Sequence, residues 1–366
     1  MAGILPDWAP SLNLGHSEIK PTRTGRYGRK KRRRRRVAVK TPIQKFYAPS
    51  PDHNYCVRQS STLAAAELQT ELKRMKASLL YSHFYLQRFA GSDEDIHFFT
   101  RFSSYRHLQN FWRFINSTET RLIQETYSLT SAANLSTKLP HIDELFMFLM
   151  YLSVGLHPDD LSKRFGVSQA AVNRVLTVWT HLLYQLLGST PLWMAQDDVR
   201  ALLPPVFEAF PDTQVLLHCI EIYCEAPSNF SKSHSTLKAV VGMAPHGAVT
   251  FVSSLFPGSM SEGEIFKLSG ITSLLQQEMV IMVHKGFLID HVTSCKVHRL
   301  AFSEKNTMSI ACLNIHFERC AQRVKENKLF CQILPASICG GINKLFHVAC
   351  YLVNYQDAPL VMKVPA

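Results

Sequence analysis

Apolar residues begin to recur at helical spacing only after a long polar start. Residues 1–60 are rich in Pro, Gly, Ser and basic residues and have no apolar period, which predicts disorder. Apolar positions then follow at spacings of three to five residues, at Leu68, Leu72, Met75, Leu79 and Phe84. This spacing predicts an amphipathic helix. Packing on the main body and a coiled coil are both open, although about two heptads is short for a coiled coil.

Two further helices are predicted between residues 91 and 115. Ser92 is a good N-cap, and the acidic residues that follow it suit the first turn of a helix. The high aromatic content of this stretch favours a place in the core over stacking on bases.

Residues 141–187 have the pattern of a helix-turn-helix. A strongly apolar helix over 142–152 ends at Gly155, and Pro158 suits the first turn of a short helix that ends near residue 165. Gly166 allows a left-handed turn, and Ser168 can cap the next helix. That helix has a buried stripe made of Val172, Val175, Leu176, Trp179, Leu182 and Leu183.

The side chains that open this last helix are suited to reading DNA. Gln169, Asn173 and Arg174 form hydrogen bonds, Ala170 is small, and these positions would face a major groove. A two-helix corner with a glycine turn also occurs in proteins that never touch DNA, so both interpretations stay open.

The second half of the chain alternates strands and helices. Strands are predicted at 213–224 and 278–283, a hairpin turns at residues 245–247, and helices are predicted at 308–327 and 341–354. This order predicts an α/β fold. The predicted organisation is a disordered basic tail (1–60), a helical region (61–135), a helix-turn-helix (136–190) and a mixed-sheet domain (191–366).

Almost the whole charge excess lies in the tail. The net charge is +12, and residues 1–50 contribute +11 of it. Eight consecutive cations occur there, namely Arg29, Lys30, Lys31, Arg32, Arg33, Arg34, Arg35 and Arg36. Such a run attracts polyanions, which predicts nuclear import, contact with DNA phosphates, or both; a tail that is merely solvated is the alternative.

Composition excludes several other classes of protein. The first residues lack the pattern of a secretion signal, and the longest apolar run, at 145–156, is too short for a membrane span of roughly 20 residues. The nine cysteines are odd in number and include no Cys-x-x-Cys pair. We therefore expect reduced thiols, an intracellular location and no membrane partner.

Four segments in order make the chain similar to a known family. VLLHCIEIYCEAPS, LKAVVGMAPHGAVTFVSSLFPGSMSEGEI, MVIMVHKGF and LNIHFERCAQRVKENKLF follow the helix-turn-helix. Together they resemble Harbinger-type (PIF-like) DDE transposases, over residues of about 85–360. The resemblance implies an RNase H-like catalytic domain in which three carboxylates hold two divalent metals that cleave DNA.

The resemblance also implies that the catalytic triad is degenerate. The first two acidic positions fall on His218 and His284, and only the third, Glu318, is an acid. Lys285 replaces the arginine that the family has beside the second position. Mg²⁺ prefers hard oxygen ligands, so we expect no cleavage by the ancestral mechanism and no cofactor, with a divalent cation required if activity is retained.

The sequence offers two ways of restoring a metal site, namely a neighbouring acid or a different metal. Glu221 lies three residues after His218 and should point to the opposite face of a strand, and Asp290 should lie on another element. His218, His284 and Glu318 could instead converge to bind Zn²⁺ or Fe²⁺. The alternative is that these residues changed freely after catalysis was lost and bind no metal.

Weaker clusters have ordinary interpretations. Cys219 and Cys224 are predicted to be small buried apolar residues, and HVTSCKVH at 291–298 a polar loop. Arg319, Arg323 and Lys325 give one helix a basic edge, which is either solvated or in contact with DNA.

Three functional hypotheses follow. The first is a domesticated nuclear protein without nuclease activity that binds DNA through its tail and helix-turn-helix, with the nuclear import machinery and a separate DNA-binding protein as partners. The second is an active endonuclease with altered metal ligands. The third is a protein-interaction scaffold without DNA affinity.

Overall fold

The structure is a computed structural model that describes residues 63–75, 78, 84–116, 139–225, 235–284, 286–287, 289, 293–300, 308–338 and 340–356. The basic run at 29–36, Lys285 and Asp290 lie outside these residues. The chain divides after Ala65, and the elements from η2 onward lie in the compact unit Ala66–Ala366. The limits predicted at residues 60, 135 and 190 stay predictions.

The described helices fall mainly before and after a central group of strands. Residues 63–75 and 105–116 are helical. The α-helices are α2 (Asp93–Thr100), α4 (His141–Val154), α5 (Pro158–Phe165), α6 (Gln169–Gly188), α7 (Gln196–Ala201), α8 (Glu262–Leu268), α9 (Met308–Lys325) and α10 (Ile342–Gln356). Short 3-10 helices are η2 (Leu86–Phe89), η3 (Pro205–Phe207), η4 (Ile271–Ser273), η5 (Lys328–Cys331) and η6 (Ala336–Ile338).

The strands form one mixed sheet. They are β1 (Thr213–Cys224), β2 (Ser235–Met243), β3 (Val249–Val252), β4 (Phe256–Pro257), β5 (Val280–His284), β6 (Lys296–Leu300) and β7 (Ile333–Leu334). The order along the sheet is β3-β2-β1-β5-β6, while β4 pairs with β2 and β7 with β1. The β1–β2 and β2–β3 pairs are antiparallel, whereas β5 is parallel to both β1 and β6. The predicted α/β chain, with helices and a helix-turn-helix ahead of a mixed sheet, is confirmed.

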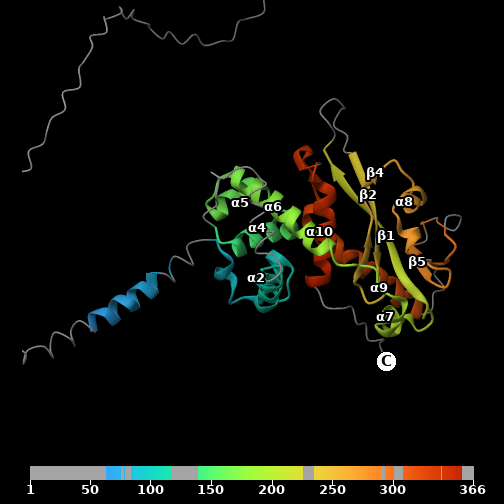
Figure 1. Cartoon of the computed structure of the whole chain (residues 1–366), viewed down its shortest axis with the longest axis horizontal. Coiled ribbons are helices and arrows are strands. Elements are labelled where there is room, and N and C mark those ends of the chain that lie inside the picture. The colour runs from blue at the N-terminus through green and yellow to red at the C-terminus, as the bar shows by residue number, and fades with distance from the viewer. Residues whose placement is uncertain are drawn as a thin grey trace, which may run out of the picture. The chain divides into compact units, whose positions relative to one another are not determined.

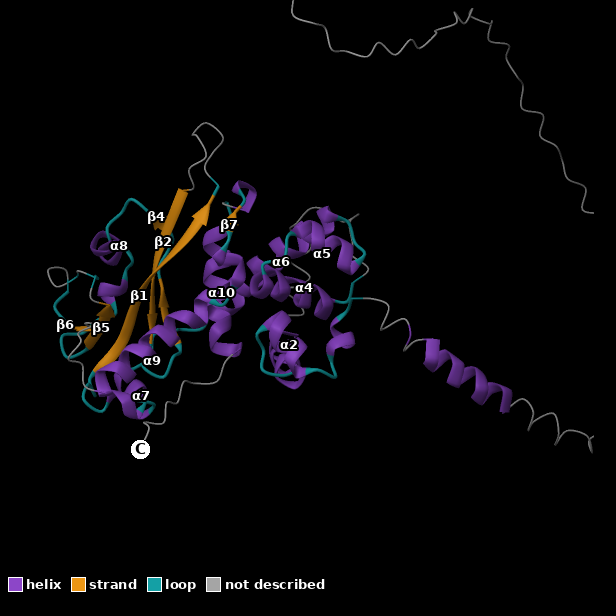
Figure 2. Ribbon diagram, turned by 180° about the vertical axis from the view of Figure 1, so that it is seen from behind, coloured by secondary structure: helices purple, strands orange, loops and turns teal. Residues whose placement is uncertain are grey.

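Each face of the sheet has its own apolar core. Along β1, Leu216, Ile220 and Ile222 belong to the larger core, which also includes residues of α9 and α10. Val215 and Leu217 point to the other face and pack with residues of α8. Figure 2 shows α8 on one side of β1 and β2, and α10 on the other.

Helix α10 joins the sheet to the helix-turn-helix. It packs on α6, β3 and α9, and in Figure 1 it lies between the α4–α6 helices and the strands. The side chain of Asn354 accepts from the backbone nitrogen of Val249 (2.7 Å) and donates to its oxygen (2.8 Å). These paired bonds fix the end of α10 against the first residue of β3.

The apolar run that opens the helix-turn-helix is a core helix. The α4 residues from Asp143 to Ser153 are all buried, which explains an apolar sequence on every face of the helix. Among the described residues, no helix is both long and apolar enough to cross a membrane.

One sequence prediction needs correction, and one capping signal was missed. The polar loop predicted at 291–298 is wrong from Lys296 onward, because residues 296–300 form β6 alongside β5. Cys295 is buried and its thiol donates to the backbone oxygen of Gln276 (3.0 Å). The capping box at Ser261 and Glu264, which starts α8, was not recognised from the sequence.

Candidate functional site

The helix-turn-helix corner is built by local signals that the sequence shows. Gly166 has φ 65° and ends α5 in the left-handed conformation. The hydroxyl of Ser168 accepts from the backbone nitrogen of Ala171 (3.3 Å) and caps α6. Leu161 and Phe165 of α5 are buried, so the two helices meet over an apolar contact. The opening turn of α6 is thereby held at an exposed corner.

A polar row runs along α6 from this corner. We define the polar row as Gln169, Asn173, Thr177 and His181, which follow one another at intervals of four residues. Thr177 donates to the backbone oxygen of Asn173, and the ring Nδ1 of His181 donates to that of Thr177, both at 2.9 Å. The side chains of Gln169 and Asn173 are exposed and are not used in hydrogen bonds to other described residues.

The polar row faces a cavity of about 510 Å³. Its opposite wall comes from residues 335–345, which belong to the region after the sheet. The remaining lining residues are Tyr151, His157, Pro158, Leu176, Thr180, Pro335, Ser337, Ile338, Gly340, Gly341 and Leu345. None of the described residues that line this cavity is acidic.

The structure separates the three predicted DNA-reading residues. Gln169 and Asn173 lie together on the polar row, but Arg174 does not line the cavity. Arg174 is half-buried, and its Nε and Nη2 atoms are shielded from solvent. The sequence missed Thr177 and His181 as members of the row, although their spacing from Gln169 would have indicated them.

The three positions that the resemblance assigns to the catalytic triad lie on β1, β5 and α9. The parallel register pairs Leu217 of β1 with Val283 of β5, so the residues that follow them, His218 and His284, are neighbours on one face of the sheet. Glu318 lies on α9, next to Phe317, which contacts His218 directly. Glu318 and His284 are both exposed.

His218 is held as a neutral imidazole. Its Nε2 lies 3.1 Å from the backbone oxygen of Phe317, and because a carbonyl oxygen only accepts, this nitrogen carries the proton. The two rings also pack, with centroids 3.9 Å apart. Burial, together with the positive charge of Lys325, lowers the pKa of His218 to about 3.

These residues do not fit a pair of divalent cations. Nε2 of His218 carries a proton that it donates to α9, so only Nδ1 of this ring has a lone pair for a cation. The positive charge of Lys325 disfavours a further positive charge at the same ring. Within the described part of the chain, no three His, Cys, Asp or Glu side chains are grouped closely enough to hold a metal ion. The predicted His218–His284–Glu318 metal site is therefore not assembled among these residues.

Other acidic side chains near the sheet do not complete a metal site among the described residues. Glu221 points to the opposite face of β1, as predicted, and pairs with Lys238 of β2 (3.4 Å). Glu262 of α8 is an acid that the sequence did not indicate. Burial raises its pKa above the usual value, and the charge of Lys238 opposes this shift only in part. Of the two cysteines on β1, Cys224 is buried as predicted and Cys219 is only partly buried.

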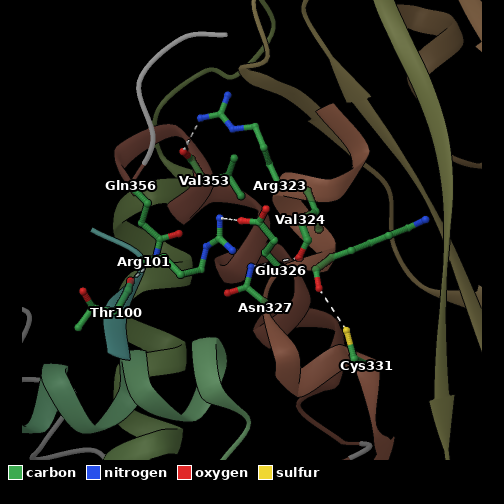
Figure 3. A network of polar contacts seen from close by, with 10 residues as sticks. Thr100, Arg101, Arg323, Val324, Glu326, Asn327, Cys331, Val353 and Gln356 are labelled. Atoms are coloured by element: carbon green, nitrogen blue, oxygen red, sulfur yellow. Dashed lines mark hydrogen bonds and ion pairs between the residues drawn. The ribbon is translucent and has the colours of Figure 1, made fainter. Parts of the chain in front are cut away.

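The predicted basic edge of α9 is wrong for Arg323. Its side chain is buried and donates to the backbone oxygens of Gly247 (2.6 Å) and Val353 (3.4 Å), which ties α9 to the β2–β3 turn and to α10. Figure 3 shows this arginine and, nearby, the ion pair between Arg101 and Glu326. These contacts fix the C-terminal end of α9. Arg319 and Lys325 are exposed, as predicted.

Comparison with known families gives two matches. The model for the DDE superfamily endonuclease matches residues 217–354, and the model for the helix-turn-helix of DDE superfamily endonuclease matches residues 137–189. No curated protein and no solved structure matches the chain. The two family matches together cover more than half of the chain and include both the corner of α5 and α6 and the sheet with α9 and α10. The chain therefore belongs to the DDE superfamily, as a transposase-derived protein with the superfamily's helix-turn-helix and endonuclease domains.

Proposed function

We propose that this transposase-related DNA-binding protein is a domesticated, Harbinger-type member that acts in the nucleus and does not cleave DNA. Its retained activity is DNA binding, through Gln169 and Asn173 of α6 and through the cationic run at 29–36. The same run serves as the signal for nuclear import. The partners are DNA, the import machinery and a separate DNA-binding protein.

One observation carries the proposed loss of cleavage. The ring nitrogen of His218 that faces α9 is spent as a donor to the carbonyl of Phe317, at the position where the family needs an oxygen anion. The proton on Nε2 leaves only Nδ1 as a possible ligand, and this is a neutral nitrogen in place of the oxygen anion that Mg²⁺ prefers. The positive charge of Lys325 also opposes a cation electrostatically. The ancestral chemistry needs two divalent ions beside a phosphodiester, which this environment disfavours.

A plasmid assay tests the proposal. Purified full-length protein is incubated with supercoiled plasmid and Mg²⁺, Mn²⁺ or Zn²⁺ in turn, and we expect no conversion to nicked or linear DNA. Conversion that is abolished by Glu318→Ala would overturn the proposed loss of cleavage. Conversion that survives in the Glu318→Ala protein would instead identify a contaminating nuclease, and the assay would be repeated on material free of it.

A gel-shift assay separates DNA binding from a scaffold role. We expect the full chain to retard a DNA duplex at low salt. The double variant Gln169→Ala/Asn173→Ala should discriminate less between DNA sequences than the wild type does. A wild-type chain that leaves every duplex unshifted would support the scaffold hypothesis. For localisation, a fluorescent fusion should lose nuclear accumulation when residues 29–36 are changed to Gln.

A further inference from the structure

Two arginines from distant parts of the sequence lie over one aromatic ring. The Cζ atom of Arg164, in the last turn of α5, is 5.3 Å from the centre of the Phe84 ring. The Cζ atom of Arg88, in η2, is 5.7 Å from the same centre and 5.8 Å from that of Phe89. Cation–π contacts at this range orient a guanidinium and leave its N–H donors available.

The ring itself has a fixed position. Phe84 packs edge-on against Phe165 of α5 (5.8 Å between centres) and Phe89 (4.9 Å), and stacks on Phe146 of α4 (6.4 Å). Both α-helices belong to the helix-turn-helix, whereas Phe84 and Arg88 precede the matched region. The segment before the helix-turn-helix thus supplies both the aromatic ring, Phe84, and one of the two cations, Arg88.

Neither cation is neutralised within the described residues. Both side chains are exposed, and no carboxylate among the residues that the structure describes forms an ion pair with Arg88 or Arg164. The neighbouring Lys163, by contrast, is paired with Asp159 (2.6 Å). The acids closest to Arg88 in sequence form the first turn of α2, where the helix dipole offsets their charge.

The position of Arg88 and Arg164 indicates that the anion they bind is a phosphate of the DNA backbone. Arg164 lies five residues before α6 begins at Gln169, beside the opening turn that would enter a major groove. In helix-turn-helix complexes the first helix crosses the DNA backbone while the second reads bases. An oriented guanidinium suits the planar, two-point recognition of phosphate.

We infer that Arg88 and Arg164, ordered by Phe84, form a phosphate clamp that grips the DNA backbone beside α6. This clamp rests on the proposed function, because it presupposes that the helix-turn-helix binds DNA. It carries no sequence information of its own and sets the register in which Gln169 and Asn173 meet base edges.

The salt dependence of DNA affinity tests the clamp. Full-length wild type and Arg88→Gln/Arg164→Gln are titrated into a labelled duplex at several salt concentrations and followed by fluorescence anisotropy. Each lost phosphate contact should reduce the slope of log affinity against log salt by about 0.9, so the double variant should lose about 1.8. Its affinity near physiological salt should fall on the order of ten-fold.

A matched double variant controls for general charge. Lys267→Gln/Lys296→Gln removes two exposed cations from α8 and β6 and should leave the slope near that of wild type. Thermal unfolding of all three proteins confirms that each is folded. The clamp is overturned if the arginine and lysine variants have the same slope, or if the arginine variant keeps the wild-type slope. A wild-type chain that binds no duplex at all would overturn the proposed function itself.

Discussion

At the residue scale, the contact between His218 and Phe317 changes what the ancestral cleft can do. The imidazole donates a hydrogen bond of 3.1 Å to the backbone oxygen of Phe317, which a carboxylate could not do, and it packs on the ring of Phe317. These interactions join β1 to α9. That contact makes folding stability depend on pH.

We expect His218 to destabilise the fold in acid. Its pKa is about 3 in the folded protein, while an unfolded histidine has about 6.5. As the pH falls below the pKa of the unfolded state, His218 binds a proton in the unfolded chain but not in the folded chain. The free energy of unfolding therefore decreases until the pH reaches the pKa of the folded state. From about pH 7.5 to about pH 5.5 the loss from this residue should approach about 1.4 kcal/mol.

His218→Gln isolates this contribution. The amide keeps a donor for the Phe317 oxygen but does not titrate. Urea unfolding of wild type and variant at both pH values should show a smaller acid loss in the variant. His246, His316 and His347, whose pKa values burial also lowers, titrate alike in both proteins. Equal acid losses in the two proteins would contradict the assignment.

The site positions were predictable from the sequence, but their contacts were not. The resemblance placed His218 and His284 on strands and Glu318 on a helix, and they lie on β1, β5 and α9. Nothing local shows that the carbonyl of Phe317, 99 residues away, takes the proton of His218. The burial of Arg323 was missed for the same reason, since its acceptors lie on the β2–β3 turn and on α10.

At the element scale, local signals predicted most of the structure. The strand at 213–224 has the bounds predicted for it, and the glycine and serine of the α5–α6 corner act as expected. Failures occurred where tertiary pairing decides the structure. Three of the five residues at 296–300 are polar or charged, and the stretch forms β6 because β5 offers an edge to pair with.

Two left-handed glycines in the helix-turn-helix should respond differently to Ala. Gly155 has φ 72°, and a Cβ there would collide with Nε2 of Gln332 and lie 3.1 Å from the backbone nitrogen of Leu329. Gly155→Ala would also disturb the bond from Gln332 to the Gly155 oxygen (2.7 Å). Backbone strain and the collision together should cost about 2–3 kcal/mol in urea unfolding.

Gly166→Ala is the matched control. Gly166 has φ 65°, but no atom lies within 4 Å of a Cβ added there, so only the conformational penalty of about 1 kcal/mol applies. If the two variants were equally destabilised, the contact between Gly155 and η5 would have no energetic role.

At the scale of the whole molecule, charge is divided between a cationic tail and a nearly neutral remainder. Replacing Arg29–Arg36 by Gln in the full chain removes eight charges. The slope of log affinity against log salt should then fall by up to about seven, because each cation can displace a counterion from the duplex. Anisotropy titrations measure both slopes, and a variant with the wild-type slope would show that the tail does not touch DNA.

The packing of helix α10 limits any attempt to transfer the α5–α6 corner to another protein. It packs against α6 on one side and is fastened to β3 through Asn354 on the other. The apolar flank of α6 is thus completed by residues more than 150 positions further along the chain. Excised as a short peptide or grafted onto another carrier, the corner would expose that flank to water, so a transplant must bring the entire sheet with it.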